Sequence, residues 1–161
     1  MIKAGLLLFM IAGTAQAAYC TGAALRFVES APRDRFELRV GEIALRAVTV
    51  DLRGSAGRLI FDTVDGGTGV QVFQPLRDEG GTTGGTVADG AEVIKVLLSD
   101  GAAGTRAVFS IDVDDRLATS DLGQIRVTGG EMAGAEARFE TVQGKVFRAV
   151  FDSTNSAVLC P

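Results

Sequence analysis

The stretch Val108–Asp115 constrains the fold most strongly, because its apolar and polar residues alternate with the period of a β-strand. It reads Val-Phe-Ser-Ile-Asp-Val-Asp-Asp, a pattern that is typical of a strand with one buried face and one polar face. We therefore expect a central core strand that ends in three carboxylates, Asp112, Asp114 and Asp115.

Short apolar segments of the same kind follow one another along the chain, with glycine-rich turns between them. The segments that we expect to be strands are Leu25–Glu29, Phe36–Val40, Ile43–Leu52, Leu59–Asp62, Val70–Phe73, Val93–Leu98, Val108–Asp115, Leu122–Val127, Ala135–Phe139, Val146–Phe151 and Ala157–Leu159. A change of phase near Ala47 indicates a β-bulge or a strand that is buried on both faces. No window keeps a helical period, although Gly129–Ala137 could hold a brief helical turn.

This pattern predicts an all-β domain. About ten closely spaced strands favour a single antiparallel two-sheet β-sandwich of the immunoglobulin-like or jelly-roll type. A closed β-barrel is the alternative. Residues 78–90 hold five glycines and almost no apolar side chain, so we expect a mobile surface loop there, too short to separate two domains.

The N-terminal segment has the features of a secretory signal peptide. Lys3 provides a positive charge, Gly5–Ala12 is a short apolar run, and Ala15-Gln16-Ala17 fits a cleavage site. We predict a signal peptide over residues 1–17 and one domain over residues 18–161, without a membrane span after cleavage. An uncleaved anchor is the alternative, but the apolar run is shorter than the roughly 20 residues that span a bilayer.

The chain has two cysteines, Cys20 and Cys160, near opposite ends of the predicted domain. In a secreted or periplasmic protein they are expected to form a disulfide bond. Closing so long a loop would stabilise the domain by about 4–5 kcal/mol on the chain-entropy model. Free or intermolecular thiols are the alternative.

The composition argues against several functions. The sequence has no histidine and no tryptophan, and it has a single tyrosine. It therefore cannot form a Ser-His-Asp or Cys-His arrangement or a histidine-containing zinc site. The formal net charge is −4, and removal of Lys3 makes it one unit more negative. An acidic chain without a basic block is a poor match to nucleic acid.

Carboxylates gather at the ends of two predicted strands. Asp62 and Asp65 follow one strand, and Asp112, Asp114 and Asp115 end another. Hard cations such as Ca²⁺ bind several carboxylate oxygens, so we expect a shared Ca²⁺ site if these two strands are neighbours. Asx-turns and protection of strand ends are the alternative explanation for the same residues. The EF-hand pattern fails, because Asp112-Val113-Asp114-Asp115-Arg116 has Arg116 where the pattern requires Asp or Asn.

Several stretches together resemble the secreted bacterial proteins known as the aggregation factor core family. They are Phe27–Phe36, Gly54–Asp62, Gly69–Pro75, Phe109–Asp115 and Leu122–Val127. The name comes from sponge adhesion proteoglycans, in which cell adhesion depends on calcium. The resemblance implies an adhesion role and brings no catalytic residues with it.

We accordingly expect a non-enzymatic exported protein that acts in adhesion, in a matrix or at the cell envelope, with a protein or surface glycan as its partner. A carrier for a small apolar ligand, held in a barrel or sandwich cavity, is a second hypothesis. A hydrolase that uses carboxylates alone is a third, and it would need two Asp side chains about 5–10 Å apart in an open cleft.

Overall fold

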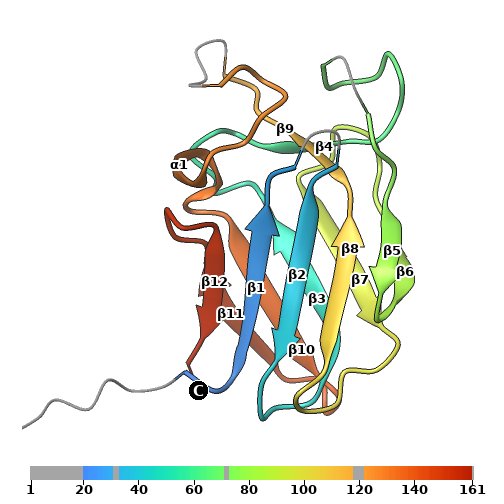
Figure 1. Ribbon diagram of the computed structural model, residues 1–161, viewed down its shortest axis with the longest axis vertical. Coiled ribbons are helices and arrows are strands. Elements are labelled where there is room, and N and C mark those ends of the chain that lie inside the picture. Colours follow the sequence, from blue (N-terminus) through green and yellow to red (C-terminus); the bar gives the residue numbers. More distant parts are fainter. Residues whose placement is uncertain (1–19, 31–32, 71–72, 118–121, 161) are drawn as a thin grey trace, which may run out of the picture.

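Two antiparallel sheets of five strands each form a β-sandwich that is not closed into a barrel. The computed structural model describes residues 20–30, 33–70, 73–117 and 122–160. The predicted signal peptide and residues 31–32, 71–72, 118–121 and 161 lie outside this part. The two sheets face each other across the core, and a small strand pair lies at one end of the molecule (Figure 1).

The first sheet has the strand order β12-β1-β2-β8-β5, and the second has the order β11-β10-β3-β7-β6. The first consists of β12 (Ser156–Leu159), β1 (Ala23–Val28), β2 (Arg35–Val40), β8 (Arg106–Ser110) and β5 (Arg77–Gly80). The second consists of β11 (Val146–Val150), β10 (Glu136–Thr141), β3 (Leu45–Asp51), β7 (Val93–Leu98) and β6 (Thr82–Thr86). The end pair is β4 (Ile60–Asp62) with β9 (Asp112–Asp114), and the one helix of the described residues is α1 (Gly129–Met132).

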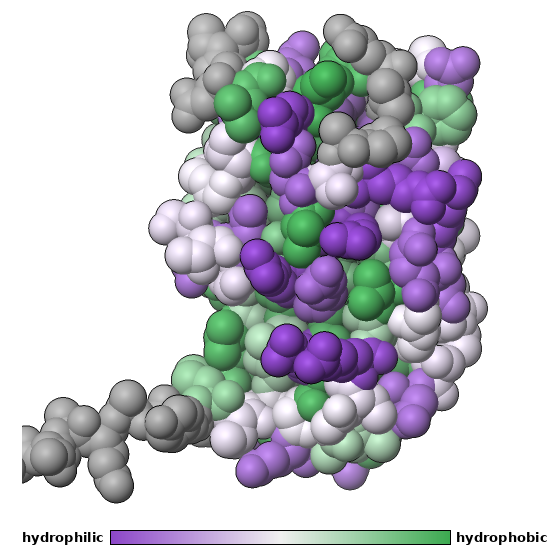
Figure 2. Space-filling model, viewed as in Figure 1, coloured by the Kyte–Doolittle hydropathy of each residue, from purple (hydrophilic) through white to green (hydrophobic). Residues whose placement is uncertain are grey.

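Alternation along the strands places apolar side chains between the sheets and polar ones outside. In β2, Phe36 and Leu38 are buried, whereas Arg35 and Arg39 are exposed. Figure 2 shows the outer face of the first sheet, with polar and apolar side chains interspersed. The predicted half-buried strands are therefore confirmed for this sheet.

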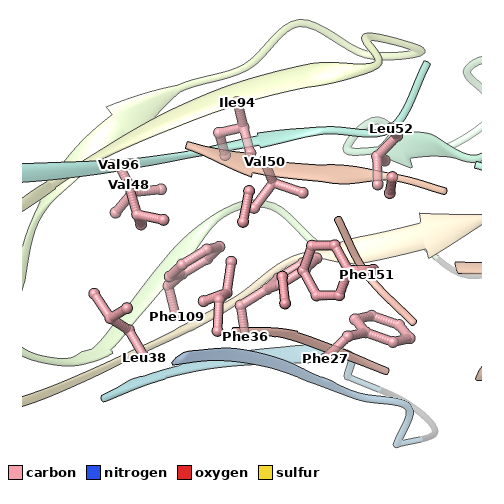
Figure 3. Packing of buried hydrophobic residues seen from close by; sticks show 14 of the residues in the cluster. Phe27, Phe36, Leu38, Val48, Val50, Leu52, Ile94, Val96, Phe109 and Phe151 are labelled. Atoms are coloured by element: carbon pink, nitrogen blue, oxygen red, sulfur yellow. The ribbon is translucent and has the colours of Figure 1, made fainter. Parts of the chain in front are cut away.

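Aromatic rings fill the centre of the sandwich. The ring centroid of Phe36 lies 5.1 Å from the centroid of Phe27 and 5.1 Å from that of Phe109. The ring of Phe151 is edge-on to Phe36, at a centroid distance of 6.4 Å. Figure 3 shows these rings facing Val50 and its neighbours on the second sheet. Aromatic pairs at such distances stabilise a core beyond the area that they bury.

The change of phase near Ala47 corresponds to a β-bulge, as predicted. Glu140 of β10 is opposite Ala47, but Thr141 is opposite Leu45, so Arg46 is the extra residue on β3. After the bulge, Ala47 and Val48 are both fully buried, and Val48 belongs to the core cluster. This explains the apolar residues of both phases.

The stretch Val108–Asp115 forms two strands instead of one. The first part belongs to β8, which is the fourth strand of its sheet and not the central one. The chain leaves the sheet at Ile111, whose N–H donates to the carbonyl of Asp34, and then forms β9 beside β4. The turn out of the sheet carries the acidic end of the stretch away from the sandwich core.

Residues 78–90 are not an irregular loop, so that prediction is wrong. They form most of β5 and all of β6, which continue the two sheets at the same side of the molecule (Figure 1). Both strands contain irregularities of register, where Gly80 and Gly84 have φ values of 143° and 110°. Other residues rarely adopt such angles, so the glycines here serve bulged edge strands rather than a flexible linker.

Two further strand predictions fail. Described residues of Val70–Phe73 and Leu122–Val127 have no strand pairing. In the second segment Val127 is buried, but Leu122 and Ile125 are exposed, so the apolar residues do not share a face. The brief helical turn predicted after this segment is present as α1, which begins with a capping box formed by Thr128 and Glu131.

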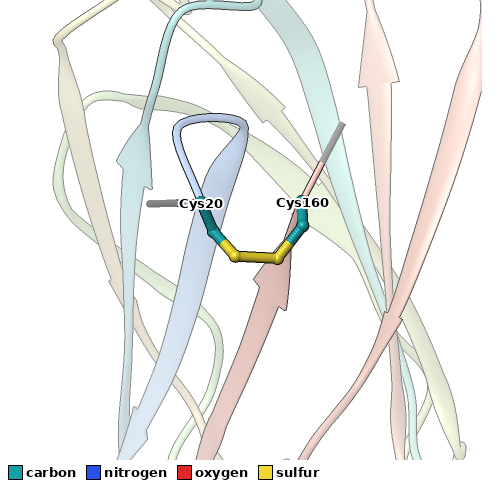
Figure 4. The surroundings of a disulfide bond; sticks show 2 residues. All are labelled: Cys20 and Cys160. Carbon is teal, nitrogen blue, oxygen red and sulfur yellow. A yellow bond between two sulfur atoms is a disulfide. The ribbon is translucent and has the colours of Figure 1, made fainter. Parts of the chain in front are cut away.

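A disulfide bond joins Cys20 and Cys160, as predicted. It connects the start of β1 with the end of β12, two strands that are paired antiparallel (Figure 4). Among the described residues, none of the helices has the length and apolar character needed to cross a bilayer.

Candidate metal centre

Three carboxylates converge on the end pair. Asp62, Asp112 and Asp114, which we call the acidic trio, each offer a side-chain oxygen within 4.8 Å of the other two. The register of β4 and β9 explains this convergence, because Asp62 is directly opposite Asp112 and Ile60 is directly opposite Asp114. Residues that are opposite each other, or two apart on one strand, share a face.

The other face of the end pair anchors it to the core. Phe61 and Val113 are opposite each other and completely buried. Their burial fixes the register, because a shift by one residue would place carboxylates in the hydrophobic core. The acidic trio is itself almost inaccessible to solvent, with exposed fractions of 3%, 7% and 1%.

Each member of the trio has a buried oxygen without a hydrogen-bond donor. These atoms are Oδ1 of Asp62, Oδ2 of Asp112 and Oδ1 of Asp114. A buried polar atom without a partner costs about 1–3 kcal/mol, and more when it is charged. Such atoms are rare in native proteins and indicate an ion, a water molecule or a proton that completes the site.

A glycine lies directly against the trio. A Cβ atom on Gly69 would be 2.3 Å from Oδ2 of Asp114 and 2.4 Å from Oδ2 of Asp62. Only glycine therefore fits at this position, and the backbone passes close to the carboxylates. The next residue, Val70, donates its N–H to Oδ2 of Asp114 at 2.6 Å.

Asp89 holds the loop that brings Gly69 to the trio. Its carboxylate accepts hydrogen bonds from the N–H of Thr63 at 2.9 Å and from both the N–H and the hydroxyl of Thr68 at 2.7 Å. These donors lower the pKa of Asp89 well below its usual value. Asp89 thus remains a carboxylate. It holds the loop between Thr63 and Thr68 in place and does not belong to the trio.

The electrostatics of the trio favour the uncharged form. Burial, followed by the charges of Asp114, Asp34 and Asp62, raises the pKa of Asp112 to about 8. Burial also raises the pKa of Asp114 to about 6, against the opposing hydrogen bond from Val70. The pKa of Asp62 is raised by burial and by the neighbouring Asp89. A bound cation would reverse this preference by supplying the missing positive charge.

Asp34 is a fourth buried acid beside this site, and the sequence analysis did not identify it. Its Oδ2 accepts from the N–H of Val113 and its Oδ1 from the N–H of Ser30, both at 3.2 Å. Burial raises its pKa to about 7. In the sequence Asp34 stands two residues before Phe36, in the buried phase of the predicted strand Phe36–Val40, so the alternation indicated its burial although the acid was not predicted as a site residue.

The other two predicted ligands do not join the trio. Asp65 is exposed, and it lines a hollow of about 160 Å³ together with Asp62, Gly69 and Phe73. Asp115 is buried, but its Oδ1 accepts from the N–H of Leu117 at 2.9 Å, and its charge acts on Asp114 from outside the group.

The donor set fits a hard divalent cation. All of its side-chain ligands are carboxylate oxygens, which Ca²⁺ and Mg²⁺ prefer over nitrogen and sulfur ligands. Two or three clustered carboxylates together with backbone oxygens are more typical of Ca²⁺, because Mg²⁺ usually keeps several waters and binds one or two carboxylates. The unpartnered carboxylate oxygens are ligands that such an ion would use.

Comparison of the chain with protein-family models, with curated proteins and with solved structures finds no match.

Proposed function

We propose that this chain is an exported, non-enzymatic β-sandwich protein that binds Ca²⁺ at the acidic trio and acts in adhesion, in a matrix or at the cell envelope. The observation that carries the proposal is the set of three buried carboxylate oxygens without donors. Ca²⁺ would offset most of the negative charge of the trio and hold the end pair and the Thr63–Val70 loop together.

The disulfide bond supports export. Such bonds persist in extracellular and periplasmic compartments and are rare in the cytosol. The Cys20–Cys160 bond is consistent with the signal-like N-terminal sequence. Calcium is also abundant enough outside cells to load sites with dissociation constants of about 10⁻⁴–10⁻³ M, the range of many extracellular modules.

The arrangement of the acids favours binding over catalysis. The trio is buried, Gly69 covers it, and the hollow beside it has a volume of about 160 Å³. Pockets that hold small organic ligands usually have volumes of about 300–1,000 Å³. A sugar or peptide therefore has little room beside these acids, and we do not favour a carboxylate hydrolase.

The packed interior likewise does not favour a carrier of apolar ligands. Phe36 and Phe109 stack between the sheets at a centroid distance of 5.1 Å, and Val50 and Ile94 of the second sheet are buried against the same core. These side chains occupy the space in which an apolar ligand would be held.

Adhesion is the activity that agrees with these features and with the resemblance to the aggregation factor core family. In this view the sandwich supplies a rigid body, and Ca²⁺ fixes one end of it. Recognition of a partner then depends on exposed surfaces and not on a reactive group.

The test is isothermal titration of the chelator-treated protein with CaCl₂, together with thermal unfolding in the presence and absence of Ca²⁺. We expect saturable binding of one ion and a rise in Tm. Asp62→Asn should abolish the binding, whereas Asp100→Asn, a control at an exposed turn, should bind as the wild type does. Absence of binding in the wild type, or equal binding by the Asp62→Asn variant, would refute the calcium proposal.

A further inference from the structure

The outer face of the first sheet is rich in arginine side chains, and among the described residues most of them form no ion pair with an acid. Five arginines point outward from β1, β2, β8 and β5. They are Arg26, Arg35, Arg39, Arg77 and Arg106. Glu37 is the one acid on the central strands of this face, and it is 3.8 Å from Arg35. Figure 2 views this face directly and shows polar rows that cross it.

The register places like charges beside each other. Arg39 of β2 is directly opposite Arg106 of β8. Directly opposite residues on antiparallel strands have Cβ atoms about 4.5–5.5 Å apart, and like charges at such positions destabilise the sheet. Among the described residues, no carboxylate forms an ion pair with either side chain.

The second sheet provides a contrast within the same molecule. On its outer face Arg46 and Lys95 both pair with Glu140, while Arg148 pairs with Glu136. On the first sheet, by contrast, Arg35 is near Glu37, but Arg39 and Arg106 form no ion pair among the described residues, although the net charge of the chain is −4. When arginines without an ion pair gather on one face of a protein whose net charge is negative, that face is suited to bind an anionic partner.

A hollow lies between two of these arginines. It has a volume of about 250 Å³, and its lining includes Arg26, Arg39 and Glu37 together with Ala24 and Val158. The guanidinium groups can bind a carboxylate or sulfate through two parallel hydrogen bonds. Glu37 can accept a hydrogen bond from a hydroxyl, and the small apolar side chains can contact a ring face.

We propose that the outer face of the first sheet binds an anionic polysaccharide, with acid groups held by Arg26, Arg39 and Arg106. Charge complementarity favours an anionic ligand. The hollow favours a sugar unit, because Glu37 in its lining can accept a hydrogen bond from a sugar hydroxyl. On β2, Arg35 and Arg39 are four residues apart, which is about 13 Å along a strand, and Arg106 is directly opposite Arg39, so the face presents several separate cationic positions to a linear chain.

Other anionic partners match this face less well. The described residues of the face include no aromatic side chain on which a nucleic-acid base could stack. Its apolar side chains stand singly, whereas protein interfaces usually have a central apolar or aromatic anchor. This proposal does not depend on the calcium site, which lies on the end pair.

The experiment measures binding to two probes, heparin for sulfate groups and polygalacturonate for carboxylate groups, in EDTA so that calcium has no part. We expect one or both to bind, with an affinity that falls as the salt concentration rises, and neutral dextran not to bind. Binding of neither acidic polysaccharide would overturn the proposal.

The variants separate this face from net charge. Arg39→Gln combined with Arg106→Gln should weaken binding at least tenfold and leave the Tm unchanged or higher, because the repulsion is removed. Arg46→Gln combined with Arg148→Gln changes the net charge equally on the other sheet and should bind as the wild type does. Equal losses in both double variants would refute the assignment to this face. Stronger binding to polyglutamate or to phosphatidylglycerol vesicles than to either polysaccharide would also overturn it, in favour of an acidic protein or a membrane surface.

Discussion

Replacing Asp112 with asparagine should stabilise the metal-free protein, although it removes a native side chain from a buried position. At a pH where the trio is ionised, two carboxylates at the observed limit of 4.8 Å repel each other by about 3–4 kcal/mol at an effective dielectric constant of about 20. Asp112 takes part in two such pairs. Partial protonation relieves some of this repulsion, so we expect Asp112→Asn to raise the free energy of unfolding by about 2 kcal/mol in chelator.

Binding of Ca²⁺ should remove the stability advantage of the Asp112→Asn variant over the wild type. At a Ca²⁺ concentration one hundred times the dissociation constant, the wild type gains about 2.7 kcal/mol, which corresponds to a rise in Tm of roughly 10 °C for a domain of this size. The variant lacks one of three carboxylate ligands. If its affinity is a hundredfold lower, it gains only about 0.4 kcal/mol at the same concentration.

The assay is urea unfolding at pH 8.5 and constant ionic strength, with and without Ca²⁺. Far-UV circular dichroism is the suitable probe, because the sequence contains no tryptophan. Urea is preferred to guanidinium chloride, which would screen the charges under study. A variant that is less stable than the wild type in chelator, with an unchanged slope m, would show that the trio is not under mutual repulsion and would refute the reasoning.

The remaining predictions concern the surroundings of the site and the stability of the sandwich. Gly69→Ala should lower both the Tm and the calcium affinity, since the added methyl group would overlap two carboxylates of the trio; unchanged titration curves would contradict this. In chelator the unfolding free energy should fall as the pH rises from 4 to about 8, because Asp112 has a folded-state pKa of about 8, above its unfolded value of 3.8, and over that interval the folded protein holds a proton that the unfolded chain has released. A stability that rises with pH there would be inconsistent with the buried trio. Phe36→Ala should cost about 3–5 kcal/mol in urea unfolding, as expected for a large side chain removed from a packed core, and a loss below 1 kcal/mol would argue against the ring cluster. Cys20→Ser combined with Cys160→Ser should lower the free energy of unfolding by about 2–5 kcal/mol, and reduction of the wild type should reproduce the loss.

Local alternation in the sequence was sufficient to predict most of the sandwich. Strands such as β2 and β7 follow the expected pattern of buried and exposed residues. The disulfide was also predictable, because the sequence has two cysteines. The bulge at Arg46 was predictable from the change of phase in the apolar residues. The prediction failed at residues 78–90, where composition suggested a loop but edge-strand pairing with β7 and β8 determines the structure.

The candidate site was predictable only in part, because its formation depends on contacts between distant segments. The acidic ends of two strands were visible in the sequence, and the pairing of Asp62 with Asp112 brings them together. The break at Ile111, which frees β9 from the sheet, has no local signal. The contact of Asp34 with Val113 of β9 and the fit of Gly69 against the trio are likewise tertiary effects that no motif in the sequence indicates.

The disulfide bond also determines how the domain would respond to mechanical tension. Cys20 comes just before β1, and Cys160 comes just after β12, so a pull on both ends of the folded part reaches the sulfur atoms before it reaches any strand. The covalent link would carry the load, and the hydrogen bonds between β1 and β12 would not be sheared. A protein strained between two attachments could thus keep both sheets, and the acidic end pair beyond them, outside the path of the force.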